Sequence, residues 1–193
     1  MSSLRVALVG AGRAGMVHGR NFAQGVPGAR LVAVVDPDDQ AREAAAAELG
    51  VASSFADPAA LLADDEVDAI VIGAPAFTHA DTAVLALEAG KHVLCEKPIA
   101  STLEQARAMA DAAEASTASF VMGFMRRFDP GFVRAAERIA QGDIGEPVMV
   151  RSTTRGPGLP PEWAWDVNRS GGLVSEVNSH DIDTIRWLSG QEP

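Results

Sequence analysis

The sequence predicts an α/β fold, in which a doubly wound parallel sheet is followed by an incomplete second α/β domain. Three observations predict it. Short β-branched apolar runs alternate with alanine-rich segments of helical length from the N-terminus to about residue 124. A glycine-rich turn follows the first run, and the alternation stops near Gly123. With 193 residues, of which 47% are hydrophobic, the chain can bury a substantial core.

Each element of the first part has its own signal. The strand segments are near-continuous apolar runs, which indicate strands buried on both faces with helical crossovers between them. The helical segments are rich in alanine, and Gly50 and Gly90 stand where left-handed C-caps are expected. The expected strands cover residues 5–10, 30–36, 68–72, 92–96 and 120–124, and the expected helices cover 19–25, 40–50, 79–90 and 103–115.

The last 70 residues follow a different pattern. We expect a helix over 130–141, a strand over 147–153, an irregular stretch over 155–172 and a final helix ending near Leu188. A single strand leaves both of its backbone edges unpaired. Either this segment packs wholly on the first domain, or the chain is the front part of a longer protein, which we favour. The predicted domains are 1–123 and 124–193.

Composition narrows the partners. A formal charge of −10 argues against nucleic acid and anionic membranes, which attract basic surfaces. The N-terminus shows no leader pattern, and no run approaches the roughly 20 apolar residues of a membrane helix, so we expect a cytoplasmic protein with a small-molecule partner. The one cysteine, Cys95, is expected to be a packed thiol. The four histidines show no ligand spacing, so no metal site is expected.

The segment "GAGRAG" predicts dinucleotide binding, because it follows a strand and opens a helix. Gly10 permits a tight turn, Gly12 lets the backbone approach a pyrophosphate, and Gly15 allows close packing of helix on strand. The next strand ends at Asp36, at the spacing expected for a carboxylate that binds the adenine ribose. Two more aspartates follow, with no arginine immediately beside them to accept a 2′-phosphate, so NAD is favoured over NADP.

The segment "GAPAFTH" follows the strand at 68–72 and lies at the carboxyl edge of the predicted sheet, where ligands of open α/β sheets bind. Thr78 is expected to cap the helix that begins at His79. The alternative for His79 is a helix-terminal histidine with no ligand. The candidate cofactor-binding residues are Gly10, Ala11, Gly12, Arg13, Ala14, Gly15, Asp36, Ala74, Pro75, His79, Glu96 and Lys97.

Lys97 stands out in "CEKPIA" because it and Lys91 are the only lysines in a chain that otherwise uses arginine. An ammonium can carry charge and also exchange a proton, which a guanidinium cannot. Further on, Glu176 and His180 lie one helical turn apart, so the carboxylate could hold the imidazole as a general base requires. The alternatives are an incidental lysine and a solvated helix face.

A helical period of about 100° per residue also places Asp183 and Trp187 on the stripe of Glu176 and His180. The same period puts Ile182 and Ile185 on the opposite face. The stripe is therefore not expected to be the main core face of the final helix.

Together "GAGRAG", "AGKHVLCEKP", "GFMRRFDP", "GDIGEP" and "SGG" followed by "HDID" and "RWL" resemble the Gfo/Idh/MocA family of NAD(P)-dependent oxidoreductases, over nearly the whole chain. The resemblance implies a Rossmann domain, then an α/β domain with a large open sheet that often mediates oligomerisation, and sugar or polyol substrates. A homo-oligomer is thus expected for a full-length form. Family members are roughly twice as long.

The resemblance also implies roles for individual residues. Lys97 matches the family's catalytic lysine and His180 its catalytic histidine; Glu176 stands where aspartate is common, and Asn178 where glycine is frequent. The Lys97–Pro98 bond is often cis in the family. The implied catalytic residues are Lys97, His180 and Glu176, and the candidate substrate contacts are Lys97, Arg127, Arg155, Asn178 and His180.

The implied reaction is hydride transfer between a secondary hydroxyl of a sugar or inositol-like polyol and NAD. Three alternatives remain open from the sequence. One is a glycosidase or epimerase that oxidises its sugar transiently and recycles NAD. The others are a non-catalytic NAD-binding regulatory protein and an inactive fragment.

Overall fold

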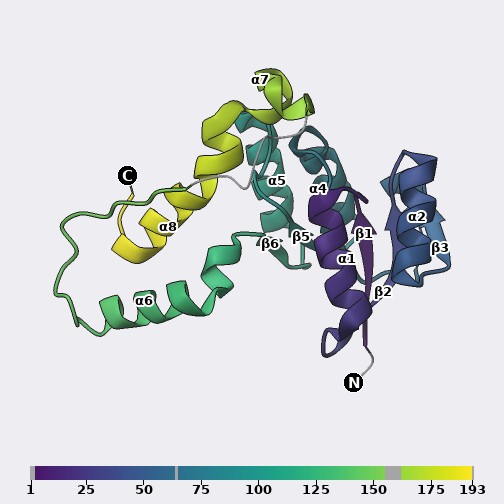
Figure 1. Cartoon of the computed structure of the whole chain (residues 1–193). Coiled ribbons are helices and arrows are strands. Elements are labelled where there is room, and N and C mark those ends of the chain that lie inside the picture. The colour runs from purple at the N-terminus through teal and green to yellow at the C-terminus, as the bar shows by residue number, and fades with distance from the viewer. Residues whose placement is uncertain (1–2, 64, 155–161, 193) are drawn as a thin grey trace. The chain divides into compact units, whose positions relative to one another are not determined.

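The computed structural model describes residues 3–63, 65–154 and 162–192, and the chain divides into two compact units, residues 1–122 and 123–193 (Figure 1). Within the described residues, none of the helices combines the length and the apolar character needed to cross a bilayer.

The first unit is built on one parallel sheet of six strands in the order β3-β2-β1-β4-β5-β6 (Figure 1). The strand order reverses between β1 and β4, so the carboxyl edge there is the switch point where open α/β sheets bind ligands. This topology confirms the predicted doubly wound fold. The strands are β1 (Leu4–Val9), β2 (Ala29–Val35), β3 (Ser53–Phe55), β4 (Ala69–Ile72), β5 (His92–Cys95) and β6 (Phe120–Met122).

The connecting helices begin and end at capping residues. Asp38 accepts the Ala41 N–H at the start of α2, Gly50 closes α2 with a φ of 69°, and Thr102 forms a reciprocal capping box with Gln105 at the start of α5. The helices are α1 (Arg13–Gly25), α2 (Asp39–Leu49), α3 (Pro58–Leu62), α4 (His79–Glu88) and α5 (Leu103–Ala115), and the 3₁₀ turn η1 (Ala76–Thr78) precedes α4.

Three features of this unit differ from the sequence-based expectation. Helix α1 covers Arg13–Gly25, so it is longer than the predicted segment 19–25 and begins in the glycine turn, as the motif predicted. The elements β3 and α3 were not predicted, since three and five residues are too short to show a period.

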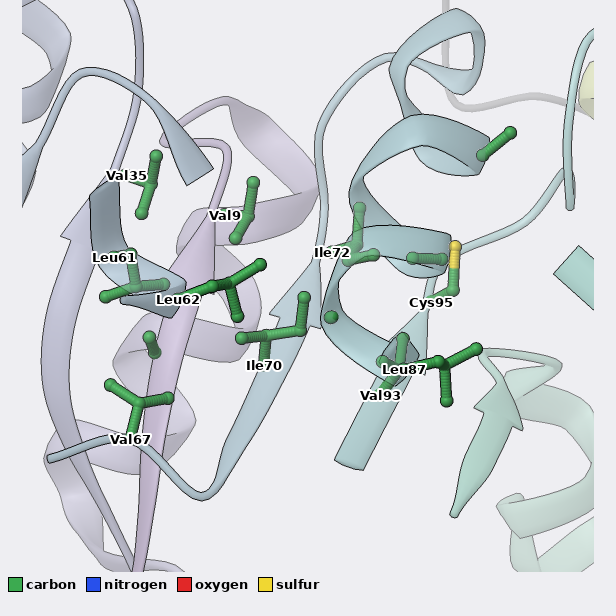
Figure 2. Close-up of a cluster of buried hydrophobic side chains, with 14 of the residues drawn as sticks. Val9, Val35, Leu61, Leu62, Val67, Ile70, Ile72, Leu87, Val93 and Cys95 are labelled. Carbon is green, nitrogen blue, oxygen red and sulfur yellow. The ribbon is translucent and has the colours of Figure 1, made fainter. Parts of the chain in front are cut away.

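Alternation along the strands builds a core on both faces of the sheet. On β1, Val6 and Leu8 join the cluster that α1 and α2 cover, while Ala7 and Val9 join the opposite cluster. Figure 2 shows the second cluster, in which side chains of β4 and β5 meet Leu61, Leu62 and Leu87 from the helices. Because both faces are buried, the central residues of β1, β2 and β4 are apolar at successive positions.

Cys95 belongs to that second cluster and is fully buried (Figure 2). Burial, together with the nearby Glu96 carboxylate, raises the pKa of the Cys95 thiol to about 12. The thiol therefore stays protonated at neutral pH, which confirms that Cys95 is a packed side chain.

The second unit consists of helices and extended segments. The prediction of a strand over 147–153 was wrong. All strands that the structure describes lie in the first unit, and residues 147–154 have no neighbouring strand with which to form a ladder. The elements are η2 (Met125–Phe128), α6 (Pro130–Ala140), η3 (Glu162–Trp165), α7 (Val167–Ser170), the π-helical η4 (Val174–Asn178) and α8 (Ser179–Ser189).

Candidate functional site

The three glycines of the turn after β1 have different surroundings. Gly10 has a φ of 95°, and a Cβ there would lie 2.7 Å from the Cα atom of Ala74. A Cβ on Gly15 would lie 1.8 Å from the Gly10 carbonyl oxygen. A Cβ on Gly12 would meet no atom within 4 Å. Two of the glycines are thus needed for contact within the chain, and the third leaves open space beside the backbone.

Gly73, at the end of β4, completes this contact and was not assigned a role from the sequence. A Cβ on Gly73 would lie 2.6 Å from the Cα atom of Gly15. The main chain of the glycine turn and that of the β4 loop therefore touch directly. The sequence signal was only that a glycine follows an apolar strand.

The open space at Gly12 lies at the N-terminus of α1. Gly12 is the N-cap residue, and among the described residues no side chain caps this helix. Free N–H groups and the positive end of the helix dipole favour a phosphate there. The site fits the pyrophosphate of a dinucleotide, because any side chain at position 12 would occupy the same space. Arg13 and Ala14, in the first turn of α1, are exposed beside it.

Asp36 holds the turn after β2 against the glycine turn. Its carboxylate accepts the Ala11 N–H at 2.8 Å through one oxygen and the Asp38 N–H at 2.9 Å through the other. Each carboxylate oxygen has a further lone pair. Asp36 can therefore fix the local backbone and still accept hydroxyl groups of a ribose.

An arginine does stand beside Asp36, which the sequence analysis missed because it lies six residues further along the chain. The Arg42 guanidinium donates to the Asp36 carbonyl at 2.9 Å and to an Asp39 carboxylate oxygen at 2.6 Å. Its positive charge is thereby balanced by Asp39. One turn of α2 is enough to bring it back to the strand end.

His79 is almost fully enclosed at the start of α4, with 1% of its surface exposed. Its Nδ1 lies 2.8 Å from the Pro98 carbonyl oxygen, and its Nε2 lies 2.8 Å from the Ala74 carbonyl oxygen. The expected Thr78 cap was wrong, because the Thr78 hydroxyl donates instead to the Pro75 carbonyl at 2.8 Å. The imidazole ties two loops together, and direct contact of His79, Ala74 or Pro75 with a cofactor stays a prediction.

Lys97 follows the end of β5 and is partly buried, and its peptide bond to Pro98 is cis. The preceding Glu96 carboxylate lies 2.7 Å from His18 Nε2, an α1 residue that the sequence did not single out. Burial raises the pKa of Glu96, but the His18 contact and the Lys97 N–H outweigh it and leave that pKa below its usual value. Glu96 is therefore held as a carboxylate.

A groove of about 460 Å³ lies elsewhere, between α4 and α5. Three acidic residues, Asp81, Glu88 and Glu104, line it. Carboxylates repel phosphate, so this groove does not suit the dinucleotide, and the turn around Gly12 remains the candidate site. No group of three His, Cys, Asp or Glu side chains in the described segments could hold a metal ion.

In the second unit, a buried ion pair fixes the start of α8. The Arg126 guanidinium donates to Asp181 at 2.9 Å; Asp181 is buried and Arg126 is partly buried. Asp181 also accepts hydrogen bonds from the Ser152 hydroxyl, from Thr154 at 2.7 Å and from Asn178 at 3.2 Å. Burial raises the pKa of Asp181, yet these four donors together hold it well below its usual range.

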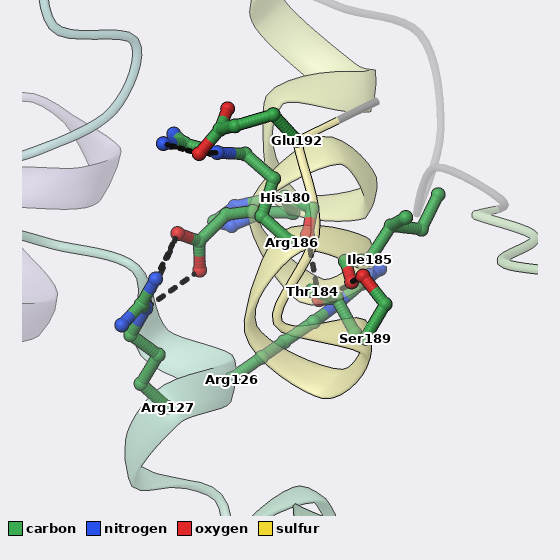
Figure 3. Close-up of polar contacts among 9 residues, drawn as sticks. Arg126, Arg127, His180, Thr184, Ile185, Arg186, Ser189 and Glu192 are labelled. Carbon is green, nitrogen blue, oxygen red and sulfur yellow. Dashed lines mark hydrogen bonds and ion pairs between the residues drawn. The ribbon is translucent and has the colours of Figure 1, made fainter. Parts of the chain in front are cut away.

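A second ion pair lies one residue further along η2, and the dashed lines from Arg127 in Figure 3 mark it. Arg127, on η2, donates to both carboxylate oxygens of the buried Asp183 at 2.8 to 3.1 Å, and its guanidinium carbon lies 5.7 Å from the Trp187 ring centre. Salt bridging to Asp183 raises the pKa of Arg127. Arg127 thus binds within the protein, and substrate contact by this residue stays a prediction.

These pairs change which face of α8 is buried. The stripe drawn at a constant helical period was inaccurate, because Glu176 lies in the wider π-helical turn of η4. Asp183 is only 5% exposed, whereas Ile182 is 41% exposed. Salt bridges to η2, which a sequence-based period cannot show, outweigh apolar character here.

His180 and its neighbours lie at the junction of η4 and α8. The His180 carbonyl accepts the Thr184 hydroxyl at 2.6 Å (Figure 3), and the ring packs edge-on against Phe124 with the ring centres 6.4 Å apart. Asn178 is bonded to Asp181, as described above. A Glu176–His180 hydrogen bond stays a prediction, and Arg155 lies outside the described residues.

Comparison with known families agrees with this geometry. Residues 4–124 match the family model described as "Oxidoreductase family, NAD-binding Rossmann fold", and residues 132–193 match the "GFO/IDH/MocA C-terminal domain". The chain belongs to the Gfo/Idh/MocA oxidoreductase family. The family predicted from the motifs is confirmed.

One relative is the scyllo-inositol 2-dehydrogenase (NAD(+)) of Bacillus subtilis. It is 39% identical to this chain, and the match covers 98% of this chain and 55% of the relative. The inositol 2-dehydrogenase of Rhizobium meliloti is 41% identical over 99% of the chain and 56% of the relative. A crystal structure of scyllo-inositol dehydrogenase from Lactobacillus casei with bound NAD(H) and scyllo-inositol has a TM-score of 0.84 at 33% identity, covering 98% of this chain and 57% of that one. The chain thus spans about half the length of these relatives.

The glycine turn generates a paired prediction. Gly12→Ala should leave thermal stability nearly unchanged, since its φ of −75° suits alanine and its Cβ meets no atom, but should weaken NAD binding at least tenfold. Gly15→Ala should lower stability, because its Cβ would overlap the Gly10 carbonyl. Calorimetric NAD titration and thermal denaturation measure the two effects. Unchanged NAD affinity in Gly12→Ala would contradict the placement of the pyrophosphate beside Gly12.

The buried ion pair generates a prediction for the second unit. Asp181→Ala should cost about 3–5 kcal/mol, because it removes the carboxylate that balances the partly buried Arg126 charge. Asp143→Ala, which removes the exposed partner of Arg138, is the control and should cost about 0–1 kcal/mol. All three tryptophans lie in this unit, so urea unfolding followed by tryptophan fluorescence reports on it.

The same pair predicts a pH dependence. Because folding lowers the pKa of Asp181, its stabilisation is complete above the unfolded-state pKa of about 3.9 and is lost as the pH falls below that value. Asp181→Asn should therefore flatten the acid side of the unfolding curve. An unchanged acid profile would contradict the assignment.

Proposed function

We propose that this chain is part of an NAD-dependent oxidoreductase that transfers a hydride between a secondary hydroxyl of a cyclic polyol of the inositol type, or of a sugar, and nicotinamide. One observation carries the proposal: the similarity to inositol 2-dehydrogenases extends over 98–99% of the chain, through both the Lys97 segment and the His180 helix. We assign residues 1–123 to the dinucleotide-binding domain and 124–193 to the start of the substrate and oligomerisation domain, with a homo-oligomer for a full-length form.

The proposed mechanism gives each residue one task. Bound NAD supplies the hydride acceptor. His180 would take the hydroxyl proton while the hydrogen on the same carbon leaves with both bonding electrons, as hydride, so that the alcohol becomes a carbonyl. Lys97 donates a hydrogen bond to the substrate oxygen, on which negative charge develops. Glu176 holds the His180 ring in the orientation and tautomer that this proton transfer needs.

The choice of lysine at position 97 follows from this task. An ammonium can stabilise the developing charge and also pass a proton, whereas a guanidinium can only do the first. The first unit supplies Lys97 and the second supplies His180, so their convergence on one substrate is part of the proposal. Candidate substrate contacts are Asn178, Arg127 and Arg155, the last of which lies outside the described residues.

Charge at the end of β2 supports NAD rather than NADP. A 2′-phosphate would meet the carboxylates of Asp36, Asp38 and Asp39. Arg42 is the nearby cation, and its guanidinium is engaged by the Asp36 carbonyl and by Asp39. The net field at the ribose is therefore unfavourable for a further phosphate.

The catalytic proposal is tested at Lys97. Lys97→Arg should lower kcat for inositol oxidation by roughly 10²–10⁴, the contribution of general acid–base groups, while NAD affinity persists. Lys91→Arg is the matched control, because Lys91 donates to the Val67 carbonyl at 2.8 Å, away from the carboxyl edge, and arginine can keep that bond. Initial rates with myo-inositol and scyllo-inositol measure the effect. Wild-type turnover in Lys97→Arg would contradict the catalytic role assigned to Lys97.

Cofactor choice is tested separately by binding. NAD should bind at least tenfold more tightly than NADP in calorimetric titrations, since about 1.4 kcal/mol of repulsion is enough for that ratio. Asp39→Asn releases the Arg42 guanidinium from its partner and should narrow the ratio. Tighter binding of NADP than of NAD by the wild-type chain would overturn the proposed selectivity.

A further inference from the structure

Two histidines outside the proposed catalytic set hold the Lys97 segment from its two ends. On the N-terminal side, His18 Nε2 lies 2.7 Å from Glu96 Oε1, and both side chains are only about one-fifth exposed. On the C-terminal side, His79 Nδ1 lies 2.8 Å from the Pro98 carbonyl oxygen. Lys97 is the residue between these two attachment points.

The first contact reaches the Lys97 backbone through a carboxylate. Glu96 Oε2 accepts the Lys97 N–H at 3.2 Å while Oε1 faces His18. An ionised carboxylate only accepts hydrogen bonds, so His18 Nε2 must be the donor. The imidazole therefore fixes the Glu96 side chain, and Glu96 in turn fixes the peptide group that carries Lys97.

The second contact links two loops at the carboxyl edge of the sheet. His79 also places Nε2 2.8 Å from the Ala74 carbonyl, so one ring spans the loop after β4 and the loop after β5. Ala74 is the residue whose backbone touches Gly10 of the glycine turn. At 1% exposure the His79 ring has little room to reorient, so it sets the spacing of these loops.

We infer that His18 and His79 are positioning residues that fix the backbone of Lys97 relative to the glycine turn, an inference that rests on the proposed role of Lys97. His18 comes from α1, the helix whose N-terminus faces the Gly12 space, so the attachment connects the dinucleotide end of the site to the lysine. A shift of the Lys97 backbone also shifts the ammonium at the end of its four-carbon side chain. Misplacement by about 1 Å can cost roughly 10²-fold in rate.

Asparagine and glutamine distinguish the two ring nitrogens. The asparagine amide nitrogen occupies the place of Nδ1, and the glutamine amide nitrogen reaches the place of Nε2. His18 uses Nε2, so His18→Gln should keep the contact to Glu96 and His18→Asn should lose it. His79 uses Nδ1 towards Pro98 and Nε2 towards Ala74, so His79→Asn should keep the Pro98 contact and lose the Ala74 contact, and His79→Gln should do the reverse. Glutamine and asparagine should therefore differ at position 18, which general destabilisation would not produce, whereas at position 79 either substitution breaks one of the two contacts.

The readout is a nuclear magnetic resonance signal from Lys97 itself. The chain has two lysines, so reductive ¹³C-methylation, which preserves their charge, yields one signal each from Lys91 and Lys97 besides that of the N-terminal amine. Lys91→Arg assigns the two lysine signals. In His18→Asn and in both His79 variants the Lys97 signal should shift and narrow, whereas in His18→Gln it should keep its wild-type position. The Lys91 signal should stay constant throughout.

Arg20→Gln provides the matched control. This substitution breaks the ion pair between Arg20, which is also on α1, and Glu48. Both side chains of that pair are about half exposed. The substitution should leave the Lys97 signal unchanged. A Lys97 signal that is identical in His18→Asn and in the wild type would overturn the inference, as would equal responses to asparagine and glutamine at position 18. Should the His79 variants fail to fold, the His18 pair decides alone.

These outcomes are separable from those of the proposed function. In inositol oxidation, His18→Asn should lower kcat by up to about 10²-fold with little change in the KM for NAD, and His18→Gln should restore it. If Lys97→Arg retains turnover while the Lys97 signal still follows the Asn/Gln pattern, the positioning stands and the catalytic role falls. If Lys97→Arg loses turnover but the signal ignores the histidines, the catalytic role stands and the positioning falls.

Discussion

The direct contact of two backbone segments, the glycine turn and the loop after β4, is the constraint on which the first unit depends. A Cβ on Gly10 or on Gly73 would overlap the main chain of the other segment, and a Cβ on Gly15 would overlap the Gly10 carbonyl. Because these contacts tolerate no side chain, they fix where α1 begins and how closely it lies on the sheet. The open space at Gly12 exists only because its neighbours are packed in this way.

The positions of more distant groups follow from that contact. With α1 held against β1 and β4, His18, about one turn beyond Gly15, reaches the Glu96 carboxylate at the end of β5. With the β4 loop held against Gly10, the Ala74 carbonyl is in place for His79. The lysine segment is therefore attached to the same framework as the phosphate-binding turn. A rigid framework of this kind is what a site with several separate groups requires.

Features that depend on residues close together in the sequence could be predicted from it. Features that depend on contacts between distant residues could not. The apolar runs predicted five of the six strands, and the glycine spacing and Asp36 predicted the turn, because each depends on neighbours within a few residues. The link from His18 to Glu96 spans 78 residues and has no local signal. Arg126 and Arg127 find carboxylates 55 and 56 residues away, so the buried face of α8 was misjudged. The strand expected at 147–153 failed because apolar character supplies no ladder partner.

The twin salt bridges of the second unit also constrain chain length. Adjacent arginines on η2 meet aspartates two residues apart on α8, so both pairs form in a single alignment. Gain or loss of one residue between Asp181 and Asp183 would turn the second carboxylate by about 100° around the helix, away from its arginine. Insertions and deletions in natural variants should thus be confined to segments such as residues 141–149, most of whose side chains face solvent.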